Sequence, residues 1–278
     1  TKQMTEYYAK IIFVNGSTLG TTFVLLNSIS KRFPNGLGND SGVLGKYLMD
    51  HHFRNGASGT VEGFEDKYFY GRRANGIYVP RYRNIGSDKR DYLRGFGYQG
   101  GASRSSWARG IAEMGVGKDF KDMLTEPGNW TMGLGGFGEC LPYEDNVVTL
   151  DTSVKDAWGQ PVLKFDAEFK ENEMKMRKDM VNDAAEMLEA AGLKDIRTYD
   201  NGSYPGMAIH EMGTARMGRD PKTSILNGWN QMHAVKNVFV TDGACMTSAA
   251  CVNPSLTYMA LTARAADYAV KELKKGNI

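Results

Sequence analysis

Residues 237–243 read Asn-Val-Phe-Val-Thr-Asp-Gly, and further on the chain continues Asn253-Pro-Ser-Leu-Thr257. The first stretch is a short apolar run that ends in a turn, which predicts a strand. Asn253 is a strong N-cap residue and Pro254 suits the first turn, so the spacing predicts a helix over roughly 254–275. A helix that begins in this way presents free N–H groups to an anion or to a ring that carries negative charge.

The apolar side of this last helix is expected to face the protein core. It carries Leu256, Met259, Ala260, Ala263 and Val270. Three lysines near the helix end complement the helix dipole. An ordinary capped C-terminal helix without a ligand would show the same pattern, so these features alone do not decide for a binding site.

A second strand and helix are expected near the start of the chain. Residues 9–14 (Ala-Lys-Ile-Ile-Phe-Val) predict a buried strand that ends at Asn15-Gly16-Ser17, and residues 19–27 predict a short helix with Phe23 and Leu26 inward. The two ends of the chain are therefore expected to share one α/β sheet. Because a buried parallel strand normally follows other elements of its sheet, we expect the chain to be part of something longer.

The middle of the chain has a different pattern. Short aromatic or β-branched runs alternate with Gly, Asn and Asp turns, which predicts an antiparallel sheet. The runs are 67–70, 76–80, 93–98, 130–137, 146–150 and, further on, 196–199. One long helix is expected over 171–191, with Met174, Val181, Ala184, Leu188 and Ala191 on its apolar side.

Composition excludes several classes of protein. Lys plus Arg is 34 and Asp plus Glu is 32, so the net charge of +2 argues against nucleic acid as a partner. No apolar stretch is long enough for a transmembrane helix. The three cysteines form no C-x-x-C, so we expect neither a metal site nor a disulfide framework. Cys245 and Cys251 could pair, but two buried thiols are the commoner arrangement.

Glycine is abundant: 33 of the 278 residues are glycine, which is about 12%, whereas the average in proteins is about 7%. Gly133-Leu-Gly-Gly-Phe-Gly138 matches the dinucleotide motif G-x-G-x-x-G. That motif requires a helix after it, whereas Pro142 follows here, so we interpret these residues as glycines within a sheet. Residues 34–45 form a second glycine-rich segment, which we expect to be a loop.

The strongest candidate for chemistry is His210-Glu-Met-Gly213-Thr214-Ala-Arg216-Met217-Gly218. A histidine can act as a general base near neutral pH, and the glycines allow a tight backbone path against a ligand. A structural histidine is the alternative. His51 and His52 could be structural or could line a pocket, and His233 has the surroundings of a turn residue. The absence of G-x-S-x-G argues against a nucleophilic triad.

Together these segments resemble the C-terminal half of the glucose–methanol–choline (GMC) family of FAD-dependent oxidoreductases. The resemblance rests on His210-x-x-Gly-Thr-x-Arg-Met-Gly218, Asp220-Pro221, Asn237–Gly243 and Asn253–Thr257, and on Gly138-Glu139 and Asn146–Asp151 upstream. It implies that His210 takes the proton of the substrate hydroxyl, that Asn253 is its partner, and that a hydride passes to flavin N5. It also implies a cofactor-binding role for Asp242, Gly243, Ala244, Pro254, Ser255, Asn15 and Gly16.

The resemblance sets an expected fold and domain division. The fold is α/β plus α+β: part of an FAD-binding doubly wound domain with an inserted substrate domain on an antiparallel sheet. Residues 1–50 would be an FAD-domain segment, 51–204 the substrate-binding domain, and 205–278 the catalytic loop and C-terminal FAD-domain segment. The family's ADP-binding G-x-G-x-x-G unit is missing from the sequence, so the chain is expected to be a fragment, or to need a second chain that carries that half.

The details resemble most the sugar-oxidising branch, such as pyranose oxidases and glucoside 3-dehydrogenases. A sugar or glycoside is then the expected substrate, and a quinone, a cytochrome or oxygen the electron acceptor. The resemblance favours a periplasmic location over a cytoplasmic one. The alternative is a truncated module with a binding or assembly role. A third and weaker hypothesis is an NAD-dependent enzyme, because no match to the dinucleotide motif has the required strand before it and helix after it.

Overall fold

The two ends of the chain meet in one parallel strand pair. In the structure, a computed structural model that describes residues 4–67, 76–104 and 115–278, β1 (Ile12–Val14) pairs with β11 (Val238–Val240), Ile12 opposite Val238. This confirms the predicted joining of the two ends. The expected burial of β1 is wrong, because Ile12 is 43% and Phe13 36% exposed. In the described residues this sheet has two strands, so one edge of β1 is not paired with another strand.

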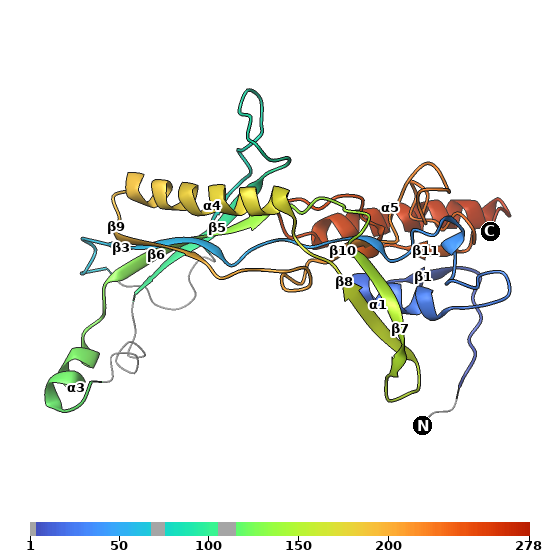
Figure 1. The fold of residues 1–278 in the computed structure, drawn as a ribbon, viewed down its shortest axis with the longest axis horizontal. Helices are drawn as coiled ribbons and strands as arrows, with labels where there is room; N and C mark the ends of the chain where they lie inside the picture. Colours follow the sequence, from blue (N-terminus) through green and yellow to red (C-terminus); the bar gives the residue numbers. More distant parts are fainter. Residues whose placement is uncertain (1–3, 68–75, 105–114) are drawn as a thin grey trace. The chain divides into compact units, whose positions relative to one another are not determined.

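The chain divides into two units (Figure 1). Unit 1 consists of Thr1–His52, Glu139–Lys170 and Tyr204–Ile278, and unit 2 of Phe53–Gly138 and Glu171–Ser203. The sequence had suggested one inserted domain over 51–204, but residues 139–170 belong to unit 1. The reason lies in the backbone: the Val148 N–H donates to the Gly45 carbonyl, at 2.7 Å, so this segment is tied to the glycine-rich loop.

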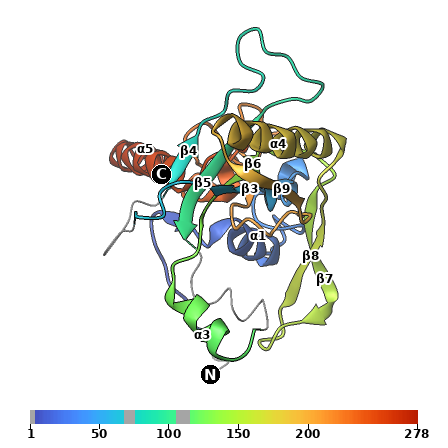
Figure 2. The same ribbon diagram turned by 90° about the vertical axis from the view of Figure 1, so that its left-hand side faces the viewer.

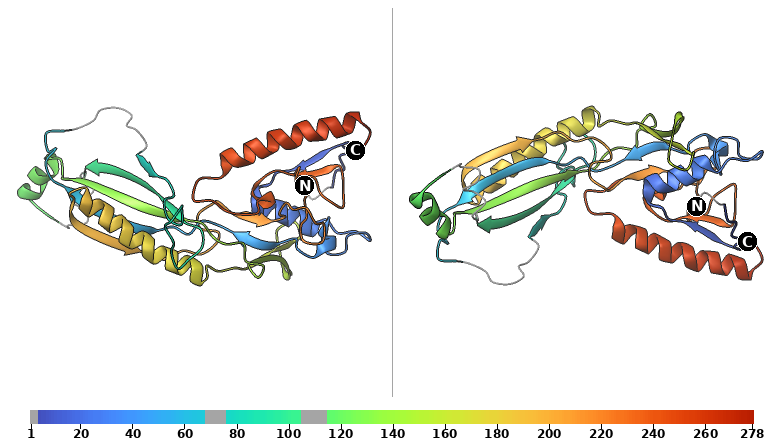
Figure 3. Two further views of the ribbon diagram at one scale, coloured as in Figure 1. Left: turned by 90° about the horizontal axis from the view of Figure 1, so that it is seen from above. Right: turned by 90° about the horizontal axis from the view of Figure 1, so that it is seen from below.

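Unit 1 also contains α1 (Ser17–Asn27), the strand pair β2 (Lys46–Met49) and β10 (Met212–Thr214), the hairpin β7 (Val147–Lys155) and β8 (Pro161–Asp166), two short 3₁₀ turns, η1 (Asn39–Ser41) and η2 (Gly243–Cys245), and α5 (Ser255–Lys274). Helix α5 lies along β1 and β11 (Figure 3). The small Ala265 and Ala269 face Phe239 of β11 and are buried.

Of the two expected helix faces in unit 1, that of α5 is wrong and that of α1 is only partly right. The predicted inner residues of α5 are exposed, including Leu256 at 78% and Met259 at 68%. Helix α5 approaches its strand through alanines instead, because only small side chains allow the close approach. In α1 the predicted inner residues Phe23 and Leu26 are half-buried, and Leu26 packs against the core as expected. The fully buried positions of α1 are Thr18, Thr21, Thr22 and Leu25. Threonines suit this face because it meets polar groups of η2 and β10.

Unit 2 is the antiparallel sheet that the sequence predicted. Its strand order is β4-β5-β6-β3-β9, with β4 (Ile77–Val79), β5 (Phe96–Arg104), β6 (Trp130–Gly138), β3 (Asn55–Val61) and β9 (Lys194–Asp200). Helix α4 (Glu171–Ala190) covers one face of the sheet, and α3 (Lys118–Thr125) stands apart (Figure 2). The predicted run 67–70 extends beyond the described residues, and the run 146–150 forms β7 of unit 1.

The core of unit 2 lies between α4 and the sheet. It contains Phe96, Tyr98 and Leu134 of the sheet and Met176, Met180, Ala184 and Leu188 of α4. Met174, which the periodicity placed on the apolar side, is 55% exposed. The buried side of α4 instead includes Arg177, whose guanidinium pairs with Asp200 and donates to the Phe53 carbonyl. The 133–138 glycines lie within β6, as predicted, so they do not form the strand–turn–helix unit that the dinucleotide motif requires.

Candidate active site

The two polar anchors of the C-terminal region come together in unit 1. Asn253 Nδ2 lies 3.2 Å from His210 Nε2, although the residues are 43 positions apart. His210 stands in the loop that enters β10, and Asn253 stands just before α5. Asn253 does not cap this helix as the sequence suggested, because α5 has no side-chain cap and its N-cap position is Pro254. The Asn253 amide is directed to the histidine instead.

A buried carboxylate holds the loop that carries His210. Asp50 follows β2, is completely buried, and accepts four backbone hydrogen bonds. Its Oδ2 accepts from the N–H groups of Gly206 (2.8 Å) and Ala208 (3.0 Å). Its Oδ1 accepts from those of His51 (2.8 Å) and His210 (3.2 Å). One side chain therefore fixes the path of residues 206–210.

His51 stands directly behind His210. Their Nδ1 atoms are 3.0 Å apart, and the rings meet edge to face with centroids 5.0 Å apart. His52 is also buried but turns away, with its ring 5.5 Å from that of Phe169. Of the two roles left open by the sequence, His51 contacts the candidate base, whereas His52 packs in the core. His233 pairs with Ser224, at 3.1 Å.

Burial governs the charge state of these groups. It lowers the pKa of His210, against an opposing effect of Asp50, so the imidazole is neutral and able to accept a proton near neutral pH. Burial and then His210 lower the pKa of His51 to about 4. The Asp50 pKa is raised by burial, which outweighs its backbone hydrogen bonds.

The low pKa of His51 predicts a pH-dependent stability. The folded protein keeps this ring neutral, whereas the unfolded chain protonates it near 6.5. Its contribution is therefore complete above pH 6.5 and is lost as the pH falls through about 4, up to about 3 kcal/mol. Urea unfolding at about pH 7 and about pH 4.5 measures this loss. His51→Asn should lose less stability between the two pH values than the wild type, since all other titrating groups are shared; equal losses would contradict the assignment.

The predicted cofactor-binding residues gather around η2 and the start of α5. A cavity of about 550 Å³ is lined by Asn15, Asp242 and Ser255, together with Thr241, Tyr258, Met259, Thr262 and Ala263. The Asp242 carboxylate accepts from Thr21 Oγ1 (2.5 Å) and from the Ala244 N–H (2.9 Å). Burial raises the pKa of Asp242.

The remaining predicted residues support the walls of this region. Asn15 Oδ1 accepts from Thr241 Oγ1 at 2.9 Å, and the exposed Gly16 donates its N–H to Thr21 Oγ1 at 2.9 Å. Gly243 and Ala244 are buried in η2, and Pro254 is buried at the start of α5. A Cβ on Gly243 would overlap with Thr18 Oγ1 and the Glu211 carbonyl, so only glycine fits there.

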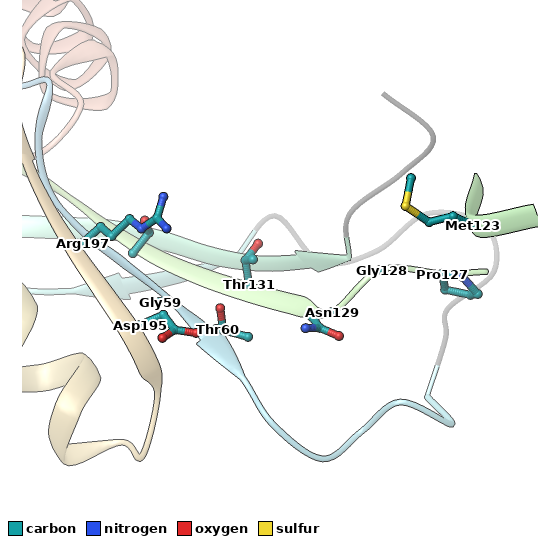
Figure 4. A pocket seen from close by; sticks show the side chains of 10 residues that line it. Gly59, Thr60, Met123, Pro127, Gly128, Asn129, Thr131, Asp195 and Arg197 are labelled. Atoms are coloured by element: carbon teal, nitrogen blue, oxygen red, sulfur yellow. The ribbon is translucent and has the colours of Figure 1, made fainter. Parts of the chain in front are cut away.

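A larger cavity, of about 720 Å³, lies in unit 2 (Figure 4). Its lining is mainly polar and includes Thr60, Thr131, Asp195 and Arg197 from three strands of the sheet. No predicted catalytic or cofactor-binding residue lines it. The sequence had placed the sugar pocket in the middle domain, and this assignment stays a prediction.

Several residues of the site were not predicted from the sequence. Thr21 and Thr18 on α1, and Asp50 after β2, gave no motif of their own. The adjacent residues Asp50, His51 and His52 are the sequence feature that could have indicated this part of the site, and the prediction used only the two histidines.

Residues 142–262 match the family model for GMC oxidoreductase. Over these residues the chain carries the C-terminal domain of the GMC oxidoreductase family. It is 37% identical over 273 residues to a 2-methyl-1,2-propanediol dehydrogenase from Mycolicibacterium austroafricanum, a match that covers 95% of this chain and 48% of that protein. It is also 26% identical over 277 residues to a fructose dehydrogenase large subunit from Gluconobacter japonicus, covering 99% of this chain and 50% of that protein.

The fold of this chain is found in a solved structure as well. A formate oxidase from Aspergillus oryzae matches with a TM-score of 0.54 at 14% identity, covering 95% of this chain and 55% of that chain. The chain thus spans about half the length of the relatives it matches. In the part of the chain that the structure describes, we find no helix with the length and apolar character to span a membrane.

Proposed function

We propose that this chain supplies the proton-accepting wall of the active site of an FAD-dependent oxidoreductase that oxidises a hydroxyl group. The observation that carries the proposal is the His210–Asn253 pair, with 3.2 Å between Nε2 and Nδ2. Ser255, two positions after Asn253, lines the cavity that also contains Asn15 and Asp242. Asn253, the partner of the neutral base, is thus close in sequence to a residue that lines the cavity, and the base and the cavity belong to the same unit.

The residues divide the reaction between them. Oxidation of an alcohol breaks its O–H and C–H bonds and forms a carbonyl group. His210 Nε2 takes the hydroxyl proton, and the Asn253 amide donates a hydrogen bond to the same oxygen without competing for that proton. FAD, when bound, would supply the acceptor for the hydride that leaves the carbinol carbon. The backbone N–H groups at the start of α5 would offset negative charge on such a ring.

The chain's residues fit part of FAD. The cavity beside η2 has polar groups from Asn15, Asp242 and Ser255. Because the chain spans about half the length of its relatives, we propose that an additional half, in the same or another chain, binds the ADP part of FAD. A quinone, a cytochrome or oxygen then takes the electrons.

We propose a ring hydroxyl of a sugar or glycoside as the substrate. Fructose dehydrogenase large subunit and pyranose 2-oxidase are among the proteins to which the chain is similar. A small vicinal diol is a second candidate, because the similarity to 2-methyl-1,2-propanediol dehydrogenase covers 95% of the chain at 37% identity.

A substrate panel tests the proposal. The protein, loaded with FAD and kept free of oxygen, is mixed with sugars, glycosides and 1,2-diols while the flavin absorbance is recorded. The expected result is loss of the oxidised flavin band with one of these classes. A protein that binds FAD but keeps its flavin oxidised with every alcohol would favour the alternative, a truncated module for binding or assembly.

The partner residue Asn253 gives a further prediction. Asn253→Ala removes the hydrogen bond to the developing negative oxygen, so the rate of flavin reduction should fall about 10²-fold. Asn253→His, which offers an N–H from a ring, should retain more of the rate. Stopped-flow measurement of both variants checks this, and an alanine variant that reduces its flavin as fast as the wild type would contradict the role.

A further inference from the structure

The Asn253–His210–His51 contacts form a line of nitrogen atoms whose proton positions depend on one another. Asn253 Nδ2 faces His210 Nε2 at 3.2 Å, and His210 Nδ1 faces His51 Nδ1 at 3.0 Å. An amide nitrogen only donates, so His210 Nε2 must accept in this arrangement. A neutral imidazole carries one proton, which then has to be on His210 Nδ1.

We propose that His51 and Asp50 are positioning residues that fix His210 in the tautomer with its proton on Nδ1 and its lone pair on Nε2. Two neutral imidazole nitrogens at 3.0 Å share one proton, so one of them donates and the other accepts. His210 Nδ1–H is the donor and His51 Nδ1 the acceptor. The proton of His51 is then on its Nε2.

The surroundings of His51 favour this direction. The Ala250 backbone acts to raise the pKa of His51, as expected where a carbonyl oxygen lies near a ring N–H. Since Nδ1 faces His210, this N–H is assigned to Nε2. The pKa of about 4 keeps the ring neutral, so Nδ1 retains the lone pair that must accept. The donors run in one direction, from Asn253 through His210 to His51.

Asp50 contributes the position of the ring. The residue before His210 is Ile209, a β-branched side chain with φ of +56° that is 82% exposed. A β-branched residue rarely adopts this strained conformation, which persists only where the surrounding structure imposes it. Asp50 imposes it, because its carboxylate holds the N–H groups of Ala208 and His210 on both sides of Ile209.

The catalytic meaning of this arrangement rests on the proposed function. If His210 is the base, only the Nδ1-protonated tautomer has a lone pair on Nε2 to receive the substrate proton. The opposite tautomer would present an N–H toward Asn253 and the substrate oxygen, and it could not take a proton there. The proton position itself exists whether or not the protein oxidises an alcohol.

The test reads the tautomer directly. In protein labelled with ¹⁵N-histidine, two-dimensional NMR at neutral pH distinguishes protonated from unprotonated ring nitrogens, and a His210→Asn sample identifies the His210 signals. The expected result is a protonated Nδ1 and an unprotonated Nε2 on His210. A protonated Nε2 on His210 in the wild type would overturn the proposal, and this measurement needs neither flavin nor substrate.

Variants of His51 separate positioning from packing. His51→Asn keeps an acceptor oxygen near the place of Nδ1 and should preserve the His210 tautomer, whereas His51→Leu removes the acceptor and should produce a mixture of tautomers. His52→Leu, next to it and equally buried, should leave the tautomer unchanged. An unchanged tautomer in His51→Leu would overturn the assignment. If His51→Leu does not fold, the wild-type and His51→Asn spectra still decide.

Kinetics connects the tautomer to the reaction. In the FAD-loaded protein, His51→Leu should slow flavin reduction by about 10-fold to 100-fold, part of the roughly 10²–10⁴-fold that a positioned base contributes, and His51→Asn should recover most of the rate. The concentration of substrate at half-maximal rate should change little. A wild type with the expected tautomer but no flavin reduction with any alcohol would reject the proposed function and leave the proton positions standing.

Discussion

His210→Asn should lower the rate of substrate-driven flavin reduction by roughly 10²–10⁴-fold while FAD remains bound. Asparagine has a similar reach but no lone pair of suitable basicity, so the hydroxyl proton has no acceptor. Asp50 should still hold the loop in this variant, because it accepts from the backbone N–H of residue 210 and not from the side chain.

The measurement is stopped-flow reduction of the flavin under nitrogen. His233→Asn is the matched control, since His233 contacts Ser224 and neither Asn253 nor the 550 Å³ cavity. We expect it to react at close to the wild-type rate. If the flavin of His210→Asn is reduced at close to the wild-type rate, His210 is not the base of the reaction.

Gly243→Ala should destabilise the protein by about 3 kcal/mol or more. The added Cβ would overlap with Thr18 Oγ1 and with the Glu211 carbonyl oxygen, and would stand 3.0 Å from the Tyr258 hydroxyl. Thr18 Oγ1 already donates to that same carbonyl, at 2.5 Å, so neither atom can move freely. The strain would fall on η2, where Asp242 and Ala244 are placed beside the cavity.

Urea unfolding of Gly243→Ala and Gly228→Ala compares a crowded glycine with an open one. No atom lies within 4 Å of a Cβ on Gly228, so its alanine variant should differ from the wild type by no more than about 0.5 kcal/mol. If the two variants unfold at the same urea concentration, the close packing around η2 does not hold in solution.

The strand patterns in the sequence predicted most of the fold. The runs at 9–14 and 237–241 led to the parallel pair β1–β11, and the middle runs led to an antiparallel sheet. Helix faces were less predictable. The periodicity of α5 pointed to Leu256 and Met259 as inner residues, but alanines make the contact with Phe239. Hydrophobicity alone does not tell which apolar side of a helix meets its strand when the closer approach needs small residues.

The site was predictable where it rests on motifs and not where it rests on backbone hydrogen bonds. His210 and Asn253 were paired in advance through the family resemblance, and the structure brings them to 3.2 Å. The role of Asp50 in holding the loop could not be predicted from the sequence, because the loop N–H groups that it binds are more than 150 positions away. Any residue type supplies such a group, so they leave no trace in a sequence.

Anaerobic flavin reduction, compared between the wild type and His210→Asn with the same sugars and 1,2-diols, tests the central claim most directly. The account predicts that at least one of these alcohols removes the oxidised flavin band of the wild type, and that the same alcohol leaves the flavin of His210→Asn oxidised on that timescale. Equal bleaching of both proteins, or a wild-type flavin that no alcohol reduces, would contradict it.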